Sequence, residues 1–322
     1  MIRLAFVIAV NCTKYSIMKQ ISLYSFIGLL GLLSLQSCKR DEPIEGKTLE
    51  GFFEENRVQD QIFTMNADSG STFITSNYIY MGIDVSPFLN SNNDTVTGNV
   101  TIRLKEIMTK GDMILSGIFS VSGGKPLVSG GEFYIEATQN GEQLHLSRPD
   151  AIYLFIPITD SIPVNDYRGF YEPALTSNTD WGTPSDTISA DFTIGGSSGS
   201  YTFGIDTLNW INCDYFYSFT GAATAVKANL TGMHTEANTK VFLTFNDYNS
   251  ACMLYRETGS LYSPGSEYEL PVGLNVTFVA ISLINGQYYS AFQSTSISSG
   301  HIENLNLTPT TLDLFKIQVG NL

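Results

Sequence analysis

The sequence predicts an all-β protein with two tandem β-sandwich domains. Only 15% of its 322 residues are charged while 12% are aromatic, and Gly, Ser, Thr and Asn are abundant. Aromatic and β-branched side chains suit the pleated, half-buried surface of a strand. Short runs with two-residue alternation recur between turn residues, and no amphipathic helix longer than three turns is evident. Many short strands with almost no helix indicate sandwiches.

The first half contains the clearest strands. From 96 to 105 the even-numbered residues are apolar or Gly and the odd-numbered residues are polar, as expected of a half-buried strand. Residues 132–137 alternate in the same way, and Asn140-Gly141 then provides the dipeptide of a type I′ hairpin. Residues 152–158 form a nearly continuous apolar strand, whereas 104–115 is compatible with one helical turn.

A segment rich in proline and polar residues predicts a linker at 161–186. It separates an N-terminal sandwich at 57–160 from a C-terminal sandwich at 187–322. Asn285-Gly286 predicts a second tight hairpin. The strands expected in the C-terminal part are 200–206, 216–220, 226–230, 241–245, 252–256, 276–283 and 287–293.

The start of the chain predicts export and lipidation. Lys19 precedes an uncharged apolar run at 21–35, which is shorter than the ~20 residues that span a bilayer comfortably. Leu35-Gln36-Ser37-Cys38 resembles the lipobox of Gram-negative lipoproteins. The resemblance implies that residues 1–37 are a signal peptide, with translation starting at Met18, and that Cys38 becomes the lipidated first residue. Several acyl chains would then hold the protein at the membrane.

The residues after Cys38 bear on location. Residues 38–56 are polar and predict a tether. The charged run 39–42 resembles the signal that sends lipoproteins of gliding and gut-dwelling Gram-negative bacteria to the cell surface; the alternative is an ordinary solvated linker. The expected location is the outer membrane, with the protein lipid-anchored at the cell surface.

One segment resembles a known module. Residues 96–147, from "VTGNVTIRLKEIMTKGDM" to the turn "ATQNG" and beyond, resemble a β-sandwich of bacterial envelope proteins that is shared more distantly by ankyrins, netrin receptors and zonula occludens proteins. Residues 208–217 and 270–281 resemble the partner domain of the same lipoproteins. The resemblance implies a structural or interaction-making role without a catalytic set.

The net charge excludes one class of partner, and the cysteine content allows a disulfide. Without residues 1–37, which hold three basic residues and no acid, 14 basic and 31 acidic residues remain, a net charge of −17. Such a surface repels phosphate backbones and excludes nucleic acid as a partner. Cys213 and Cys252 form an even pair that an oxidising compartment permits to bond. Two buried free thiols are the equal alternative.

The candidate catalytic motifs lack their structural context. Gly195 to Gly199 fits G-x-S-x-G, but a strand follows it where a hydrolase needs a helix. Ser122 to Lys125 spells S-x-x-K on a turn. His145, His234 and His301 have no partner at metal-ligand spacing. The sequence therefore predicts no catalytic residue, no metal, no cofactor and no enzymatic activity.

The aromatic stretch "WINCDYFYSF" at 210–219 is the best candidate for binding. Trp210, Tyr215 and Tyr217 are proposed as stacking residues, because flat aromatic rings bury a large area at low entropic cost. Alternation puts Trp210 on one strand face and both tyrosines on the other, and simple core packing is the alternative.

The expected function is that of a lipid-anchored, non-enzymatic interaction or structural module of the outer membrane, with another envelope protein as its partner. The alternative is a surface glycan-binding lipoprotein that assists polysaccharide uptake. A hydrolase is the least favoured reading.

Overall fold

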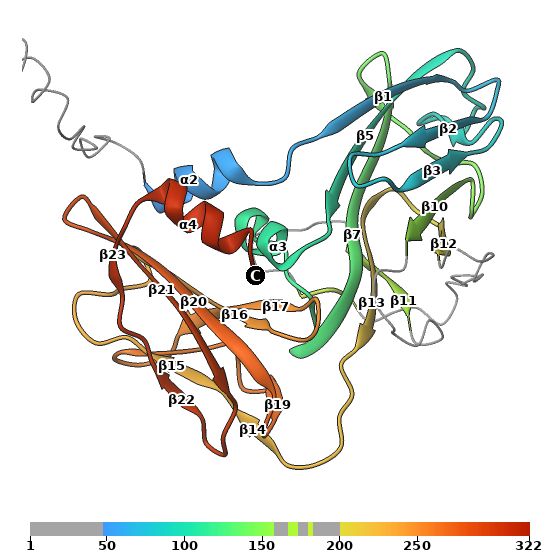
Figure 1. Cartoon of the computed structure of the whole chain (residues 1–322). Coiled ribbons are helices and arrows are strands. Elements are labelled where there is room, and N and C mark those ends of the chain that lie inside the picture. Colours follow the sequence, from blue (N-terminus) through green and yellow to red (C-terminus); the bar gives the residue numbers. More distant parts are fainter. Residues whose placement is uncertain (1–47, 158–166, 173–179, 183–199) are drawn as a thin grey trace, which may run out of the picture. The chain divides into compact units, whose positions relative to one another are not determined.

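The computed structural model describes residues 48–157, 167–172, 180–182 and 200–322. Within these ranges the chain is all-β, as predicted, with three short helices beside several sheets (Figure 1). Cys38, its lipobox and the G-x-S-x-G motif at 195–199 lie outside the described residues.

The largest sheet of the first half is antiparallel and carries the candidate site. Its order is β1 (Gln61–Asn66), β5 (Asn99–Ile107), β7 (Lys125–Gln139), β13 (Asn209–Phe216) and β11 (Arg168–Glu172). Two short strands, β6 (Val121–Ser122) and β8 (Glu142–Gln143), also pair with β7. This sheet is called the site sheet below.

A second antiparallel sheet covers the inner face of the site sheet. Its order is β12 (Ser200–Ile205), β10 (Ile152–Pro157), β3 (Tyr80–Ile83) and β2 (Ser71–Ile74). A buried cluster containing Ile102, Phe133, Leu154 and Phe203 draws side chains from both sheets, which is the arrangement of a β-sandwich. The two-stranded pair of β4 (Phe88–Leu89) and β9 (His145–Leu146) completes this region.

The C-terminal half forms an eight-stranded sheet. Its order is β22 (Ile302–Asn304), β15 (Lys227–Asn229), β18 (Leu261–Ser263), β17 (Ala251–Arg256), β16 (Thr239–Phe245), β20 (Asn275–Ile284), β21 (Gln287–Ser296) and β23 (Thr308–Thr310). One face buries a cluster that includes Leu243 and Phe278, together with Leu270 of the pair β14 (Ala223–Ala225) and β19 (Glu269–Pro271).

A middle layer joins the two halves. Helices α2 (Leu49–Asn56), α3 (Lys110–Ser116) and α4 (Leu312–Val319) contribute to a third buried cluster. Phe242 and Val279 of the eight-stranded sheet and Ile107 of the site sheet pack into the same cluster. Each helix begins at a threonine whose side chain accepts a backbone N–H of the first turn, namely Thr48, Thr109 and Thr311.

Most local predictions of strands and turns are confirmed, but the strand predicted at 216–220 is wrong, because β13 ends at Phe216 and residues 217–220 form no strand. Val100, Ile102 and Leu104 are buried on one face of β5. Asn140-Gly141 has φ values of 52° and 84°, and Asn285-Gly286 has 51° and 77°, so both central residues of each hairpin adopt positive φ. Where one helical turn was expected within 104–115, the structure has α3, a helix of seven residues or about two turns that ends at Ser116 and is stabilised by a capping box between Thr109 and Asp112.

Three longer-range expectations need correction. The predicted tether 38–56 contains α2, which buries Leu49 and Phe52. The predicted linker 161–186 contains β11, which pairs with β13. Strands β12 and β13 pair with β10 and β7 rather than with strands that follow residue 220, so strand pairing does not begin anew at residue 187. Residues 47–322 form one compact unit, and the division into two domains stays a prediction.

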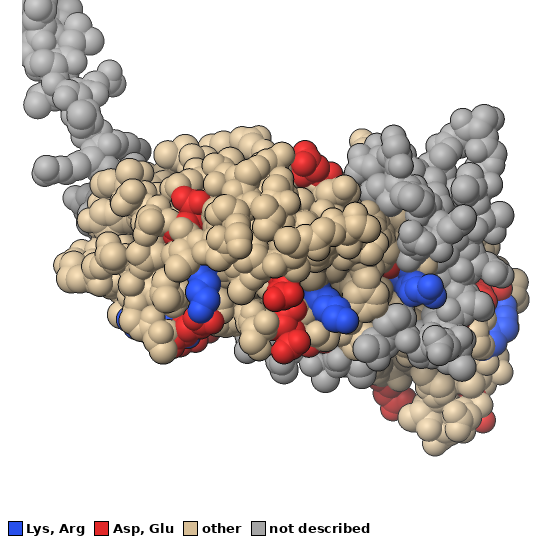
Figure 2. All heavy atoms as spheres, turned by 90° about the horizontal axis from the view of Figure 1, so that it is seen from below, with Lys and Arg blue, Asp and Glu red and all other residues tan. Residues whose placement is uncertain are grey.

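Two surface properties accompany this fold. Among the described residues no helix has the length and apolarity to cross a bilayer. The face in Figure 2 shows acidic and basic side chains scattered among uncharged residues, without a gathering of basic side chains in the part described there.

Candidate functional site

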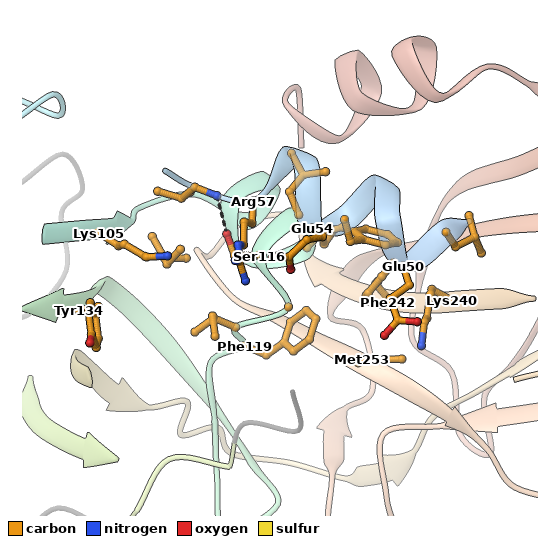
Figure 3. A pocket seen from close by; sticks show the side chains of 18 of the residues that line it. Glu50, Glu54, Arg57, Lys105, Ser116, Phe119, Tyr134, Lys240, Phe242 and Met253 are labelled. Atoms are coloured by element: carbon orange, nitrogen blue, oxygen red, sulfur yellow. Dashed lines mark hydrogen bonds and ion pairs between the residues drawn. The ribbon is translucent and has the colours of Figure 1, made fainter. Parts of the chain in front are cut away.

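A groove of about 950 Å³ lies beside the outer face of the site sheet. Helix α2, the segment 114–119, strands β5, β7 and β13 and the neighbouring strands β16 and β17 line it. In Figure 3, Tyr134 and Lys105 lie at one end of the groove, and Lys240, Phe242 and Met253 lie at the other. Phe119 lies between these two ends. The volume is in the range of small-ligand sites.

Two aromatic rings form part of the groove floor. Tyr134 of β7 and Trp210 of β13 are opposite each other in the strand register, and their ring centroids are 5.4 Å apart at an interplanar angle of 51°. Burial, followed by the nearby charge of Glu136, raises the pKa of Tyr134, so its hydroxyl stays protonated at neutral pH. The pair thus offers apolar ring surface with a neutral hydroxyl at its edge.

Charged side chains surround this aromatic pair. Arg103 Nη1 lies 3.0 Å from Glu136 Oε2, and Arg103 Nε lies 3.7 Å from Asp60 Oδ2. Lys105 Nζ lies 3.3 Å from Asp60 Oδ1. The groove lining includes equal numbers of bases and acids, namely Arg57, Arg103, Lys105, Lys240, Glu50, Glu54, Asp60 and Glu236. Unlike the chain as a whole, the groove therefore has no acidic excess.

The structure separates the three predicted stacking residues. Trp210 lies at the groove, but Tyr215 points to the opposite face of β13 and packs on Tyr167 at 5.1 Å between ring centroids. Tyr217 packs on Phe245 and on Tyr248, each at 5.1 Å. The three rings therefore lie in different surroundings: Trp210 and Tyr215 are on opposite faces of β13, and Tyr217 follows the end of this strand.

Sequence reasoning missed Tyr134, the actual partner of Trp210. The signal was present, since Tyr134 is an aromatic residue on the polar side of an otherwise regular alternation in β7. Its meaning depends on the pairing of β7 with β13, which joins residues 76 positions apart. The local pattern does not contain that pairing.

A row of buried polar residues lies next to the aromatic pair on the same face of the sheet. Glu132 is opposite Asn212 in the register, and Asp214 follows two positions later on β13. All three side chains are fully buried. Ser120 Oγ donates to Glu132 Oε1 at 3.1 Å, and Asn212 Nδ2 donates to Asp214 Oδ2 at 2.7 Å. Asn212 and Asp214, on the same face of β13 as Trp210, are thus neighbours of the buried acid Glu132 of β7.

The environment of this row favours protonated acids. Burial, together with the charge of Asp214, raises the pKa of Glu132 well above its usual range. Burial raises the pKa of Asp214 to about 7, against hydrogen bonds from Ser129, Asn212 and the Gly130 backbone that lower it. At neutral pH the row therefore holds at least one proton.

Cys213 and Cys252 are buried thiols that are not joined by a disulfide, so the predicted disulfide alternative is wrong. Cys213 belongs to the core of the first sandwich, and Cys252 belongs to the cluster of the eight-stranded sheet. Burial raises the pKa of Cys252 to about 12, which keeps its thiol protonated and unreactive.

The remaining motif residues lie in a hairpin turn or in hydrogen-bonded pairs. Ser122 and Lys125 flank a two-residue hairpin turn in which Gly123 and Gly124 have positive φ. His145 Nε2 contacts Asn93 Oδ1 at 3.1 Å, and His234 Nδ1 contacts Ser282 Oγ at 3.1 Å. In the described part of the chain, no group of three or more His, Cys, Asp or Glu residues is arranged to hold a metal ion.

His301 comes nearest to a catalytic arrangement. Its Nε2 lies 3.1 Å from Glu303 Oε2 and its Nδ1 lies 3.2 Å from Ser298 Oγ. Nδ1 also accepts the Ser298 backbone N–H at 3.2 Å, so its lone pair is already engaged by the turn. The Gly300 N–H, a natural donor to an oxyanion, donates instead to Thr224 Oγ1 at 2.8 Å. None of these residues lines the groove.

Comparisons with known proteins give no family. No family model matches the chain, and no curated protein matches it. A solved structure of a gamma-CGTase from Alkalophilic bacillus clarkii is similar at 12% identity and a TM-score of 0.18, over 74% of this chain and 42% of that chain. The chain therefore spans about two fifths of that protein's length.

The similar protein is a cyclodextrin glycosyltransferase, an enzyme, and the expectation that no enzymatic activity is present is withdrawn. A likeness at a TM-score of 0.18 carries no argument about the fold, activity or substrate of this chain.

Proposed function

We propose that the protein is a lipid-anchored component of the bacterial cell envelope that binds a glycan in its groove. The observation that carries this proposal is the pair of Tyr134 and Trp210 on the groove floor, 5.4 Å apart between ring centroids. The apolar face of a sugar ring packs on aromatic rings, and surrounding polar groups hydrogen-bond its hydroxyls.

The charges of the groove favour a neutral ligand. Four bases and four acids line it, and Arg103, Lys105 and Asp60 already form ion pairs with neighbouring side chains. A strongly charged ligand would break these pairs, whereas hydroxyl groups can add hydrogen bonds to them. A neutral glycan therefore fits the groove better than a nucleotide, a polyanion or an acidic peptide.

Affinity electrophoresis tests glycan binding. The full chain is run through gels that contain xylan, mannan, β-glucan or pullulan, and a retained band identifies the polysaccharide class. Trp210→Ala and Tyr134→Ala should each weaken retention at least tenfold, since each removes half of the stacking surface. Tyr78→Ala is the matched control, because Tyr78 is an exposed tyrosine that does not line the groove. Retention that survives Trp210→Ala would contradict the role of the groove.

The anchor is tested separately. Labelled palmitate should enter the wild-type protein, and Cys38→Ala should abolish labelling and release the protein from sedimented membranes. Cys252→Ala is the control, because Cys252 is a buried thiol that does not belong to the lipobox. An unchanged membrane fraction of Cys38→Ala would contradict lipid anchoring and would leave the groove proposal intact.

A second candidate function is interaction with another envelope protein. The outer face of the four-stranded sheet carries Ile74, Tyr80 and Phe155 in register on three adjacent strands, with 57%, 50% and 37% of their surfaces exposed. A photo-crosslinking residue at position 80 should capture one defined envelope protein on intact cells, while one at Glu142 should not. Equal products from both positions would contradict this candidate.

A further inference from the structure

The buried acids Glu132 and Asp214 lie next to the groove on the same sheet face. Glu132 is two residues from Tyr134 on β7, and Asp214 is four residues from Trp210 on β13, so alternation places all four side chains on one side. The aromatic pair lines the groove, whereas the acids are fully buried beside it. A change at the acids would therefore act on the groove from within the protein.

The hydrogen bonding of the acids is incomplete without a proton. Glu132 Oε2, Asp214 Oδ1 and Asn212 Oδ1 are buried and have no hydrogen-bond partner in the described part of the chain. Carboxylates and the amide oxygen only accept, so these three oxygens lack a donor even though Ser129, Asn212 and the Gly130 N–H donate to Asp214. A proton on each carboxyl removes both charges, while ionisation of either acid leaves a negative charge without a cation in a water-free site.

The surroundings supply no cation to balance two negative charges. Within the described ranges no Lys, Arg or His forms an ion pair with Glu132 or Asp214. Three bases lie on the surrounding elements: Lys110 of α3 donates to Phe245 O, Lys105 of β5 pairs with Asp60, and Arg168, opposite Asp214 on β11, is exposed. The other charged groups nearby are acids, namely Asp112, Asp180 and Asp247.

One hydrogen bond joins the acids to the groove wall. Ser120, which donates to Glu132, directly follows Ile118 and Phe119, and both of these line the groove. Trp181 fixes the same segment, since its Nε1 donates to Phe119 O at 2.9 Å and its backbone N–H donates to Val121 O at 2.8 Å. Displacement of Ser120 would therefore move the wall and the surroundings of Trp181 together.

We propose that Glu132 and Asp214 form a proton-dependent latch for the groove wall at residues 116–121. The protonated pair keeps Ser120 and the wall packed on the site sheet, and loss of protons loosens the wall and weakens ligand binding. The part that concerns ligand binding rests on the proposed function of the groove. The pKa of Asp214, raised by burial to about 7, puts the transition near neutral pH.

Fluorescence of Trp181 tests the latch without a ligand. The protein has two tryptophans, so Trp210→Phe leaves Trp181 as the only one. In this variant the emission of Trp181 should shift between pH 5 and pH 9 with a midpoint near pH 7. Addition of Asp214→Asn should abolish the transition. Addition of Glu106→Gln should preserve it, because Glu106 is a buried carboxyl bonded to Gln61 and Asn77 on the opposite face of β5.

Retention in polysaccharide gels tests the link to binding. With Trp210 intact, retention of the wild-type chain should weaken above pH 7, by up to about tenfold per pH unit for one linked proton, and Asp214→Asn should remove this dependence. A Trp181 transition that persists in Asp214→Asn, or one that millimolar Ca²⁺ shifts, would overturn the latch. Retention without any Trp181 transition would overturn the latch but support the groove. A transition without retention at any pH would overturn the groove function alone.

Discussion

Two neighbouring rows of side chains on one face of the site sheet differ in their exposure. Tyr134 and Trp210 form the floor of an open groove, whereas Glu132 and Asn212, two residues earlier on β7 and two residues later on β13, are completely buried. The strands, their register and their alternation are the same for both rows. The difference comes from α3 and the segment after it, which cover the second row and leave the first beside the groove.

The comparison teaches that alternation determines the face of a residue but not its environment. Residues 116–121 cover part of the outer face of the site sheet, and the side chains beneath them are buried. Polar side chains that would be ordinary on a solvated face then become buried acids with raised pKa values. The groove and the buried row therefore have the same cause, because residues 116–121 cover only part of this sheet face.

The largest expected effect contrasts the two faces of β7. Phe133→Ala should lower the free energy of unfolding by about 3–5 kcal/mol, because it opens a cavity in the first sandwich core. Tyr134→Ala should lower it by less than Phe133→Ala, because Tyr134 is partly exposed at the groove. Urea denaturation measures both. Equal losses would show that the groove floor is as structurally integral as the core.

The next effect concerns the buried row and its dependence on pH. Asp214 has an ordinary pKa of 3.8 when unfolded and a pKa of about 7 in the folded protein, so the folded state binds the additional proton between these values. The free energy of unfolding should therefore fall by about 1.4 kcal/mol per pH unit as pH rises through this window, and stay lowered above it.

The variant Asp214→Asn removes this contribution. Its free energy of unfolding relative to wild type should rise between pH 4 and pH 7 and then level off, as measured by urea denaturation across pH. Asp94→Asn, at an exposed aspartate, is the control and should parallel wild type. Parallel curves for Asp214→Asn and wild type would show that the buried row does not titrate in this range.

The sequence alone was sufficient to predict the local elements of this fold. The alternation of 96–105, the hairpins at Asn140-Gly141 and Asn285-Gly286 and the short helix α3 are all encoded within a few residues. Backbone geometry and side-chain spacing determine them, and long-range partners do not change them.

The candidate site was only partly predictable because it depends on distant pairings. Trp210 was identified, but Tyr134 becomes its neighbour only when β13 crosses back to β7, and Glu132 becomes buried only when α3 covers it. The same return of β13 explains why a strand assigned to the second domain belongs to the site sheet. Tyr215 lies on the opposite face of β13 from Trp210, as alternation predicted, whereas Tyr217 follows the end of the strand and packs on Phe245.

A glycine bulge within the row of buried polar residues gives a smaller effect. The register of β7 against β13 shifts between Asn212 and Asp214, at Gly130-Gly131, and Gly131 has a φ of 135°. A Cβ there would meet the Phe133 ring at 2.8 Å and Met108 Sδ at 3.0 Å. Gly131→Ala should therefore lower the free energy of unfolding by about 1–3 kcal/mol through strain and contact.

Gly141→Ala provides the matched comparison for this bulge. Gly141 also has positive φ, 84°, but its Cβ would meet nothing within 4 Å. It should lower the free energy of unfolding by about 1 kcal/mol, from backbone strain alone. Denaturation midpoints of the two variants measure the difference, and a smaller loss for Gly131→Ala would show that the bulge relaxes without disturbing the buried row.

The smallest effect is expected at the charged end of the groove. Arg103 is nearly half exposed, at 46%, and its ion pairs with Asp60 and Glu136 compete with water and salt. Arg103→Met keeps the aliphatic stem and should change the free energy of unfolding by about 1 kcal/mol or less, with the difference from wild type shrinking as salt is added. Thermal unfolding at low and high salt measures this. A loss comparable to that of Phe133→Ala would mean that the rim holds the sheet together, and that the groove row and the buried row differ less than their exposure indicates.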